Sequence, residues 1–185
     1  LVDCYSFWTF SDIFAENYFP SMPFHGGFGL LNLEGIAKPS YRAFQLLHQL
    51  GTELLPVQGN HATVDAWAVR DINRVTLVLT NFALPRHPIR TEQVQLQLTN
   101  VAPPKHAYVE RVDEQHAHPR ARWEQMGKPK YLSATEVAEL EAASVVDMEP
   151  HPFNYQTDQQ TLQVELTLPP QAVAMLTVEL TPPIP

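Results

Sequence analysis

The sequence has little cysteine, little basic charge and no long apolar run. Cys4 is the only cysteine among 185 residues, which excludes an internal disulfide and a cysteine-based metal cluster. Twelve basic residues stand against 20 acidic ones, a net charge of −8 that disfavours binding to nucleic acid or to an anionic membrane. No apolar run approaches the roughly 18 residues of a membrane span. Since 44% of the residues are hydrophobic, we expect a folded globular protein. We expect neither nucleic acid nor a membrane as its partner.

Glycine is also scarce, and its distribution is uneven. The chain has 7 glycines and 17 prolines, and five of those glycines lie within the first 51 residues. This contrast predicts two parts of different design, residues 1–51 and residues 52–185. The chain is also too short for a complete (β/α)8 barrel, which needs about 250 residues.

The first part has the pattern of one strand–loop–helix unit. Residues 1–8 are apolar and aromatic, as in a buried strand, and an irregular aromatic stretch follows to about residue 37. Lys38-Pro39-Ser40 predicts a helix start with proline in the first turn, and Gly51 predicts its end. The expected apolar row of this helix is Tyr41, Phe44 and Leu47, with Leu46 and Leu50 beside it.

The second part has the pattern of an antiparallel β-sandwich. Residues 93–98 alternate strictly between glutamine and an aliphatic residue, which is typical of a half-buried strand. Residues 71–73 and 169–171 have turn composition. Ser133 and Glu136 form a capping-box pattern, so we expect one helix there, with Val137 and Leu140 on one face. The predicted strands cover residues 53–56, 63–70, 74–82, 92–99, 106–113, 161–168 and 172–180.

The densest group of candidate functional residues is at positions 8–16. It follows the carboxyl end of the predicted buried strand, where parallel α/β folds place their active sites. Trp8 offers a flat apolar wall for a sugar ring, and Asp12 or Glu16 can accept hydrogen bonds from its hydroxyls. The alternative is that Trp8 belongs to the core and that the acids are solvated or cap a loop.

Several segments of the chain form a recognisable set of motifs. They are Phe7-Trp8-Thr9-Phe10-Ser11-Asp12-Ile13-Phe14, Pro23-Phe24-His25-Gly26-Gly27-Phe28-Gly29-Leu30-Leu31, Gly35-Ile36-Ala37-Lys38-Pro39-Ser40-Tyr41-Arg42-Ala43-Phe44, Arg111-Val112-Asp113, Ala121-Arg122-Trp123, Met126-Gly127 and Pro129. Together they resemble the carboxyl-terminal part of glycoside hydrolase family thirty-nine, the β-xylosidases and, more distantly, the α-L-iduronidases. The resemblance spans most of the chain and is most specific in the first 50 residues.

The resemblance implies a mainly β fold. It makes residues 1–51 the last strand, loop and helix of a catalytic TIM (β/α)8 barrel, and residues 52–185 an antiparallel β-sandwich accessory domain. A helical insertion near residues 114–144 is then expected to shape the entrance of the active site. The same likeness suggests a bacterial cytoplasmic or periplasmic location.

The resemblance also implies which residues contact the substrate. Trp8 lines the subsite of the cleaved sugar and Glu16 hydrogen-bonds its hydroxyls, while Asp12 and His25 are further candidate substrate-binding residues. Family members often carry two adjacent acids where this chain has Ala15 and Glu16.

No catalytic residue is expected within this chain. Retaining glycosidases use an acid/base and a nucleophile about 5 Å apart, and in this family both come from earlier barrel strands, the acid/base in an Asn-Glu sequence. The parent protein is thus expected to be a retaining xylan 1,4-β-xylosidase-type hydrolase that releases xylose from xylo-oligosaccharides. The chain alone is expected to be inactive, and no cofactor is expected.

Several other residues permit a second interpretation. His106, Glu114, His116 and His118 suggest a metal site, but their spacing fits exposed loop histidines better, so no metal is expected. Cys4 is expected to be a small buried residue. The basic residues Arg120, Arg122, Lys128 and Lys130 are expected on a solvated face, and Trp67 and Trp123 in the sandwich core rather than as sugar platforms.

Two functional hypotheses remain from the sequence. The first is a glycosidase fragment whose partner is the missing barrel portion of the same protein. Because the apolar faces of residues 1–50 need cover in the isolated chain, we expect them to fold back on the sandwich or to associate with another copy of the chain. The second is a stand-alone β-sandwich module that binds carbohydrate or protein. The aromatics concentrate in residues 5–28 rather than along the strands, which favours the first.

Overall fold

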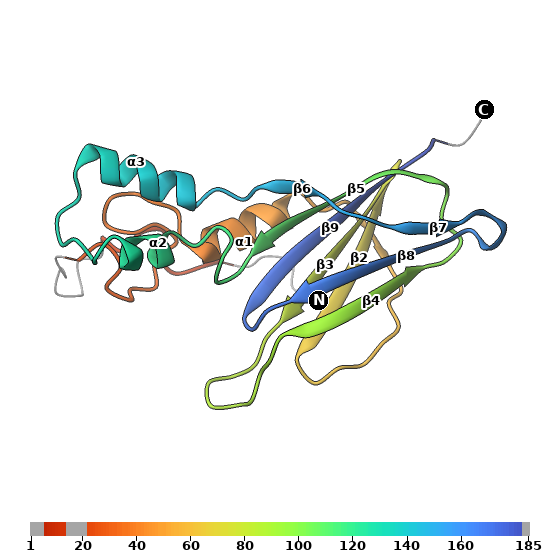
Figure 1. Ribbon diagram of the computed structural model, residues 1–185, viewed down its shortest axis with the longest axis horizontal. Helices are drawn as coiled ribbons and strands as arrows, with labels where there is room; N and C mark the ends of the chain where they lie inside the picture. Colours follow the sequence, from red (N-terminus) through yellow and green to blue (C-terminus); the bar gives the residue numbers. More distant parts are fainter. Residues whose placement is uncertain (1–5, 14–21, 183–185) are drawn as a thin grey trace.

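The computed structural model describes residues 6–13 and 22–182, and it is mainly β (Figure 1). The helices of the described part gather at one end, and the strands extend away from them. None of these helices is long and apolar enough to cross a membrane. In chain order the elements are α1 (Pro39–His48), β1 (Glu53–Leu55), β2 (Val64–Asp71), β3 (Arg74–Asn81), β4 (Glu92–Leu98), β5 (Pro104–Val112), α2 (Pro119–Gln125), α3 (Ala134–Ala143), β6 (Met148–Pro150), β7 (Asn154–Gln156), the 3-10 turn η1 (Thr157–Gln159), β8 (Thr161–Leu168) and β9 (Ala172–Leu180).

The strands form two antiparallel sheets packed face to face. The larger sheet has the order β1-β2-β3-β9-β5-β6 and the smaller one the order β4-β8-β7. All seven expected strands are present, each within two residues of the expected bounds. The sequence did not reveal β6 and β7, two further strands of three residues each. The expected β-sandwich is therefore confirmed.

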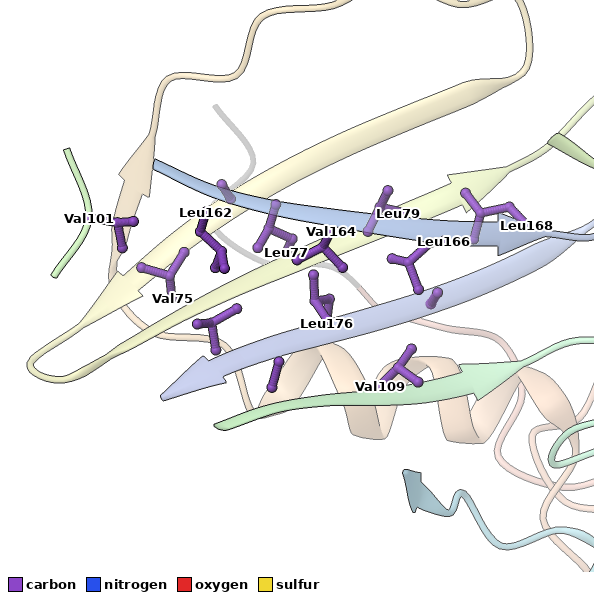
Figure 2. Packing of buried hydrophobic residues seen from close by; sticks show 14 residues of the cluster. Val75, Leu77, Leu79, Val101, Val109, Leu162, Val164, Leu166, Leu168 and Leu176 are labelled. Carbon is purple, nitrogen blue, oxygen red and sulfur yellow. The ribbon is translucent and has the colours of Figure 1, made fainter. Parts of the chain in front are cut away.

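The main core lies between the two sheets (Figure 2). From Leu162 to Leu168 along β8 the residues alternate between buried and exposed, and the buried ones meet side chains of β3 and β9 from the larger sheet. Full burial of one such side chain contributes roughly 1.5–3 kcal/mol. The central members of this core, labelled in Figure 2, include Leu77, Leu79, Leu162, Val164, Leu166, Leu168 and Leu176.

Helix α1 covers part of the outer face of the larger sheet. Leu46 is 1% exposed and packs in a cluster with Val78 of β3 and Met175 of β9, so this helix rests on the sandwich. Leu47, from the expected apolar row, is 45% exposed. The helix starts at Pro39 as predicted and ends at His48.

The expectation that Gly51 ends helix α1 is wrong. Gln49 forms the C-cap with ordinary right-handed backbone angles, so no left-handed glycine is needed. Gly51 instead allows the chain to approach β2 closely, since a Cβ at this position would lie 2.6 Å from the carbonyl oxygen of Arg70.

Glu110 on β5 is a buried carboxyl group near the end of helix α1. It is 7% exposed and receives a hydrogen bond from the Gln49 side chain; burial raises its pKa, and this hydrogen bond opposes the rise. A raised folded-state pKa stabilises the protein below the unfolded pKa, and this stability is lost as the pH rises through the folded pKa. We expect Glu110→Gln to raise the free energy of unfolding by about 1 kcal/mol near pH 7, measured by urea unfolding between pH 4 and 8.

A matched control for this substitution is Glu124→Gln. Glu124 is solvent-exposed, and its pKa is lowered, chiefly by a hydrogen bond from Lys128, so its contribution has the opposite sign. Stability of Glu110→Gln that declines with pH as steeply as that of the parent chain would contradict the assignment to Glu110.

The helical insertion between β5 and β6, residues 114–144, contains α2 and α3 and is called the excursion below. The predicted capping box is present: the backbone N–H of Glu136 donates to Ser133 Oγ, and the Ser133 N–H donates to the Glu136 carboxylate. Helix α2 was not predicted. The basic residues of the excursion are at least 45% exposed where they form ion pairs, as Arg120 and Lys128 do with Glu124.

The expectation for the two tryptophans was wrong in part. Trp67 is 46% exposed, because it lies on the face of β2 opposite the partly buried Ala66 and the buried Ala68. Trp123 is only 2% exposed, but it packs in a separate cluster at the helical end rather than between the sheets.

The expected buried strand at residues 1–8 lies partly outside the described residues, which also omit Cys4. Its described portion, Ser6 to Trp8, is neither a strand nor buried. A parallel barrel strand is stabilised by neighbouring strands on both sides. In the part of the chain that the structure describes, no strand pairs with residues 6–8.

Candidate functional site

The candidate site is built from two backbone segments that run side by side. The N–H of Leu30 donates to Thr9 O at 3.0 Å and the N–H of Leu31 to Phe10 O at 2.9 Å, while the Asp12 N–H donates to Leu31 O at 2.9 Å. Residues 9–12 and 29–31 are thereby held in register. We call residues 22–37, which follow in sequence and lead into helix α1, the glycine loop.

Asp12 is the buried centre of this arrangement. Its carboxylate, 1% exposed, accepts hydrogen bonds from Lys38 Nζ at 2.8 and 3.0 Å and from the Gly29 N–H at 2.8 Å. Lys38 Nζ also donates to the carbonyl oxygen of Gly27 at 2.7 Å. The ion pair therefore joins the segment after Trp8, the glycine loop and the N-cap of helix α1.

His25 lies against the same carboxylate. Its Nε2 is 3.7 Å from Asp12 Oδ2, and this buried nitrogen makes no hydrogen bond. Gly27 makes the close packing possible, since a Cβ there would lie 2.5 Å from His25 Cε1. The structure thus brings two of the predicted site residues, Asp12 and His25, together around Lys38.

Trp8 lies at the surface. It is 67% exposed, and the peptide bond that joins it to Thr9 is cis. Phe10 and Phe28 are also at least half exposed, so apolar rings border the glycine loop on the solvent side. The fourth predicted site residue, Glu16, lies outside the described residues.

A cleft of about 370 Å³ opens beside the glycine loop. Phe24 and Phe28 contribute aromatic surface, and Asp12 lies in its wall. His118 and Arg120 of the excursion close it from the other side. No local pattern in the sequence predicted that this pair faces the loop, because it lies some 80 or more residues away along the chain and meets the loop only in the folded protein.

Two of the histidines considered for a metal site, His116 and His118, instead contact neighbouring groups of the excursion and of Asp113. His116 Nδ1 is 2.8 Å from Asp113 Oδ1, and His118 Nδ1 accepts the Ala121 N–H at 3.0 Å to cap α2. Both line a second cavity, of about 390 Å³. Among the residues that the structure describes, no three His, Cys, Asp or Glu side chains are grouped as metal ligands.

Comparison with known proteins identifies a family and several relatives that this chain resembles. The model of glycosyl hydrolases family 39 matches residues 1–160. The β-xylosidase of Caldicellulosiruptor saccharolyticus is 39% identical over 178 residues, which cover 95% of this chain and 36% of that protein. The β-xylosidase of Geobacillus stearothermophilus is 35% identical over 142 residues, 77% of this chain and 27% of that protein.

A solved structure also matches along nearly the whole chain. It is a monomeric β-xylosidase from Caulobacter crescentus CB15, with a TM-score of 0.74 and 25% identity, over 97% of this chain and 38% of that one. The chain thus spans about a third of the length of the relatives it matches.

The chain shares its fold and much of its sequence with enzymes of one class, the glycoside hydrolases. Within that class, the chain belongs to glycosyl hydrolases family 39.

Proposed function

We propose that the chain is the carboxyl-terminal part of a retaining β-xylosidase-type enzyme that releases xylose from xylo-oligosaccharides. The observation that carries the proposal is 39% identity to a β-xylosidase along 95% of the chain, with only 36% of that enzyme covered. The exposed aromatic ring of Trp8 beside a loop held in register adds chemical support, because sugar rings stack on such surfaces.

We further propose that residues 1–51 belong to the catalytic barrel and residues 52–185 to the accessory sandwich. Helix α1 supports this division, because one side of it packs on the sandwich through Leu46 while Leu47 on another side is 45% exposed. The natural cover for the exposed side is the remaining barrel of the same protein. In the isolated chain this side is instead a surface for self-association.

In this proposal the residues near Trp8 bind the sugar and do not break its bond. Trp8 supplies the apolar wall, and Glu16 accepts hydrogen bonds from sugar hydroxyls. Asp12 and His25 set the position of the loop, since both oxygens of Asp12 already accept hydrogen bonds from Lys38. A carboxylate engaged in this way is a poor nucleophile or acid, so the two catalytic carboxyl groups, about 5 Å apart in a retaining enzyme, belong to the other part of the protein.

The chain alone is therefore expected to be inactive. A purified sample of the 185 residues should release no detectable nitrophenol from a nitrophenyl β-xyloside, whereas the complete protein should turn it over with retention of configuration. Turnover that co-purifies with the isolated chain through two different separations would contradict the expected absence of the catalytic pair.

The competing hypothesis, a stand-alone binding module, has one observation in its favour. Trp67 is 46% exposed on the outer face of β2 and offers a ring to a ligand. Its cross-strand partner is Val78, not a second aromatic, so the sheet lacks at this point the paired rings of an extended sugar platform. Binding of xylo-oligosaccharides to the isolated chain that is lost in Trp67→Ala would favour the module.

A further inference from the structure

We propose that Trp123, on helix α2 of the excursion, is a positioning residue for the substrate-binding loop. This inference rests on the function proposed above, because it assumes that the glycine loop and the segment after Trp8 hold the sugar. Trp123 is separated by more than 100 residues from Trp8 and belongs to the sandwich part of the sequence.

Trp123 is the aromatic centre of a small core at the helical end. Its ring lies 5.6 Å from that of Phe24, and it shares a cluster with Ile36 and Leu140, each 0% exposed. The indole Nε1–H donates to Pro129 O at 2.9 Å, which fixes the orientation of the ring. Two members of this cluster, Phe24 and Ile36, are the ends of the segment that carries the loop glycines.

The contact is transmitted to the candidate site through short covalent and hydrogen-bonded steps. Phe24 directly precedes His25, which packs on Asp12, and Gly29 donates its N–H to the same carboxylate. Asp12 in turn is four residues from Trp8 and is joined to Leu31 by its own N–H. A displacement of Phe24 therefore moves the residues that hold Trp8 and its neighbours in place.

The cluster around Trp123 is separate from the sandwich core, which allows a local effect. The main core consists of residues from the strands and from residue 101 and contains no member of the Trp123 cluster. A second tie also remains when Trp123 is altered: Arg42 of helix α1 donates to Ser144 Oγ at the end of α3, at 3.0 Å. Loss of the indole is then expected to loosen the loop without detaching the excursion.

The test uses Trp123→Leu and Trp123→Phe in the complete protein. A smaller side chain leaves a cavity beneath Phe24, and a misplacement of about 1 Å at a substrate-binding group can reduce catalytic efficiency about a hundredfold. We expect Trp123→Leu to raise KM for xylobiose at least tenfold with a smaller change in kcat, and Trp123→Phe to restore most of the loss. A purely structural defect would instead lower the active fraction, and hence the apparent kcat, at unchanged KM.

The matched control is Tyr131→Leu, also an aromatic-to-leucine change in the excursion, at a side chain that is 79% exposed. It should leave KM unchanged. Hydrogen exchange of the Gly29 and Leu31 amides gives a second readout that needs no activity, and both amides should lose protection in Trp123→Leu but not in Tyr131→Leu.

The two readouts separate failure of this inference from failure of the proposed function. Unchanged KM in Trp123→Leu, or unchanged protection of the two amides, would overturn the positioning role. If the complete wild-type protein does not cleave xylobiose, the proposed function falls, and the positioning of a substrate loop falls with it whatever the exchange data show.

Discussion

Replacing Gly29 with alanine is expected to lower the free energy of unfolding by about 3 kcal/mol and to remove the protection of the Leu31 amide from hydrogen exchange. A Cβ at this position would lie 2.3 Å from the carbonyl carbon of Ser11 and 2.4 Å from the backbone nitrogen of Asp12. Both are backbone atoms within the paired segments, so no side-chain rotation relieves the clash. The two segments must separate, and the Gly29 N–H then leaves the Asp12 carboxylate.

Gly26→Ala is the matched control for this substitution. Gly26 has a φ of +91°, which disfavours alanine, but a Cβ there would meet nothing within 4 Å. Its expected effect is about 1 kcal/mol, from the backbone conformation alone. Thermal unfolding and hydrogen exchange of both variants separate clash from strain, and equal losses in the two would show that the close approach at Gly29 is unimportant.

The β-sandwich could be predicted because its strands carry their information locally. Each of β4 and β8 shows the period of two that a half-buried strand requires. The turn at Ile72 and Asn73, between β2 and β3, is predicted by the residue types at the turn itself. The capping box of α3 is likewise complete within four residues. Features of this kind need no knowledge of what packs against them.

The features that the sequence did not show depend on contacts between distant residues. Trp67 has a large apolar side chain of the kind expected in a core. The register of β2 with β3 places it on the face of the sheet that points away from the main core. The expected strand at residues 1–8 depends on neighbouring strands that the described residues do not supply. Sequence periodicity reports which face of an element is apolar, not what covers that face.

The sequence pointed to two side chains of the candidate site but not to the contacts between them. Asp12 and His25 were recognised from a motif, and the structure brings them together. Lys38 was identified only as the start of a helix, although its side chain reaches 26 positions back to Asp12. The spacing of these residues in the sequence does not predict the Asp12–Lys38 ion pair, because its formation depends on the path of the glycine loop.

The Asp12–Lys38 pair leads to the second large expected effect, which is unequal for its two members. Lys38→Met leaves a carboxylate that is 1% exposed without its cation, and we expect a loss of about 3 kcal/mol in the free energy of unfolding. Asp12→Asn should be milder, because the Lys38 side chain is 14% exposed and keeps its hydrogen bond to Gly27 O. The helix start is preserved in both, since Lys38 accepts the first helical hydrogen bonds through its backbone carbonyl.

The double variant Asp12→Asn, Lys38→Met distinguishes pairing from general packing. With neither charge present, no uncompensated carboxylate stays buried, so the double variant should unfold at a higher urea concentration than Lys38→Met alone. Additive losses would mean that the two side chains act independently, and the ion pair would then not be what holds the glycine loop to helix α1. The sign of that coupling, measured by urea unfolding, thus decides whether the loop beside Trp8 is fixed by electrostatics or by its backbone hydrogen bonds and the packing around Phe24.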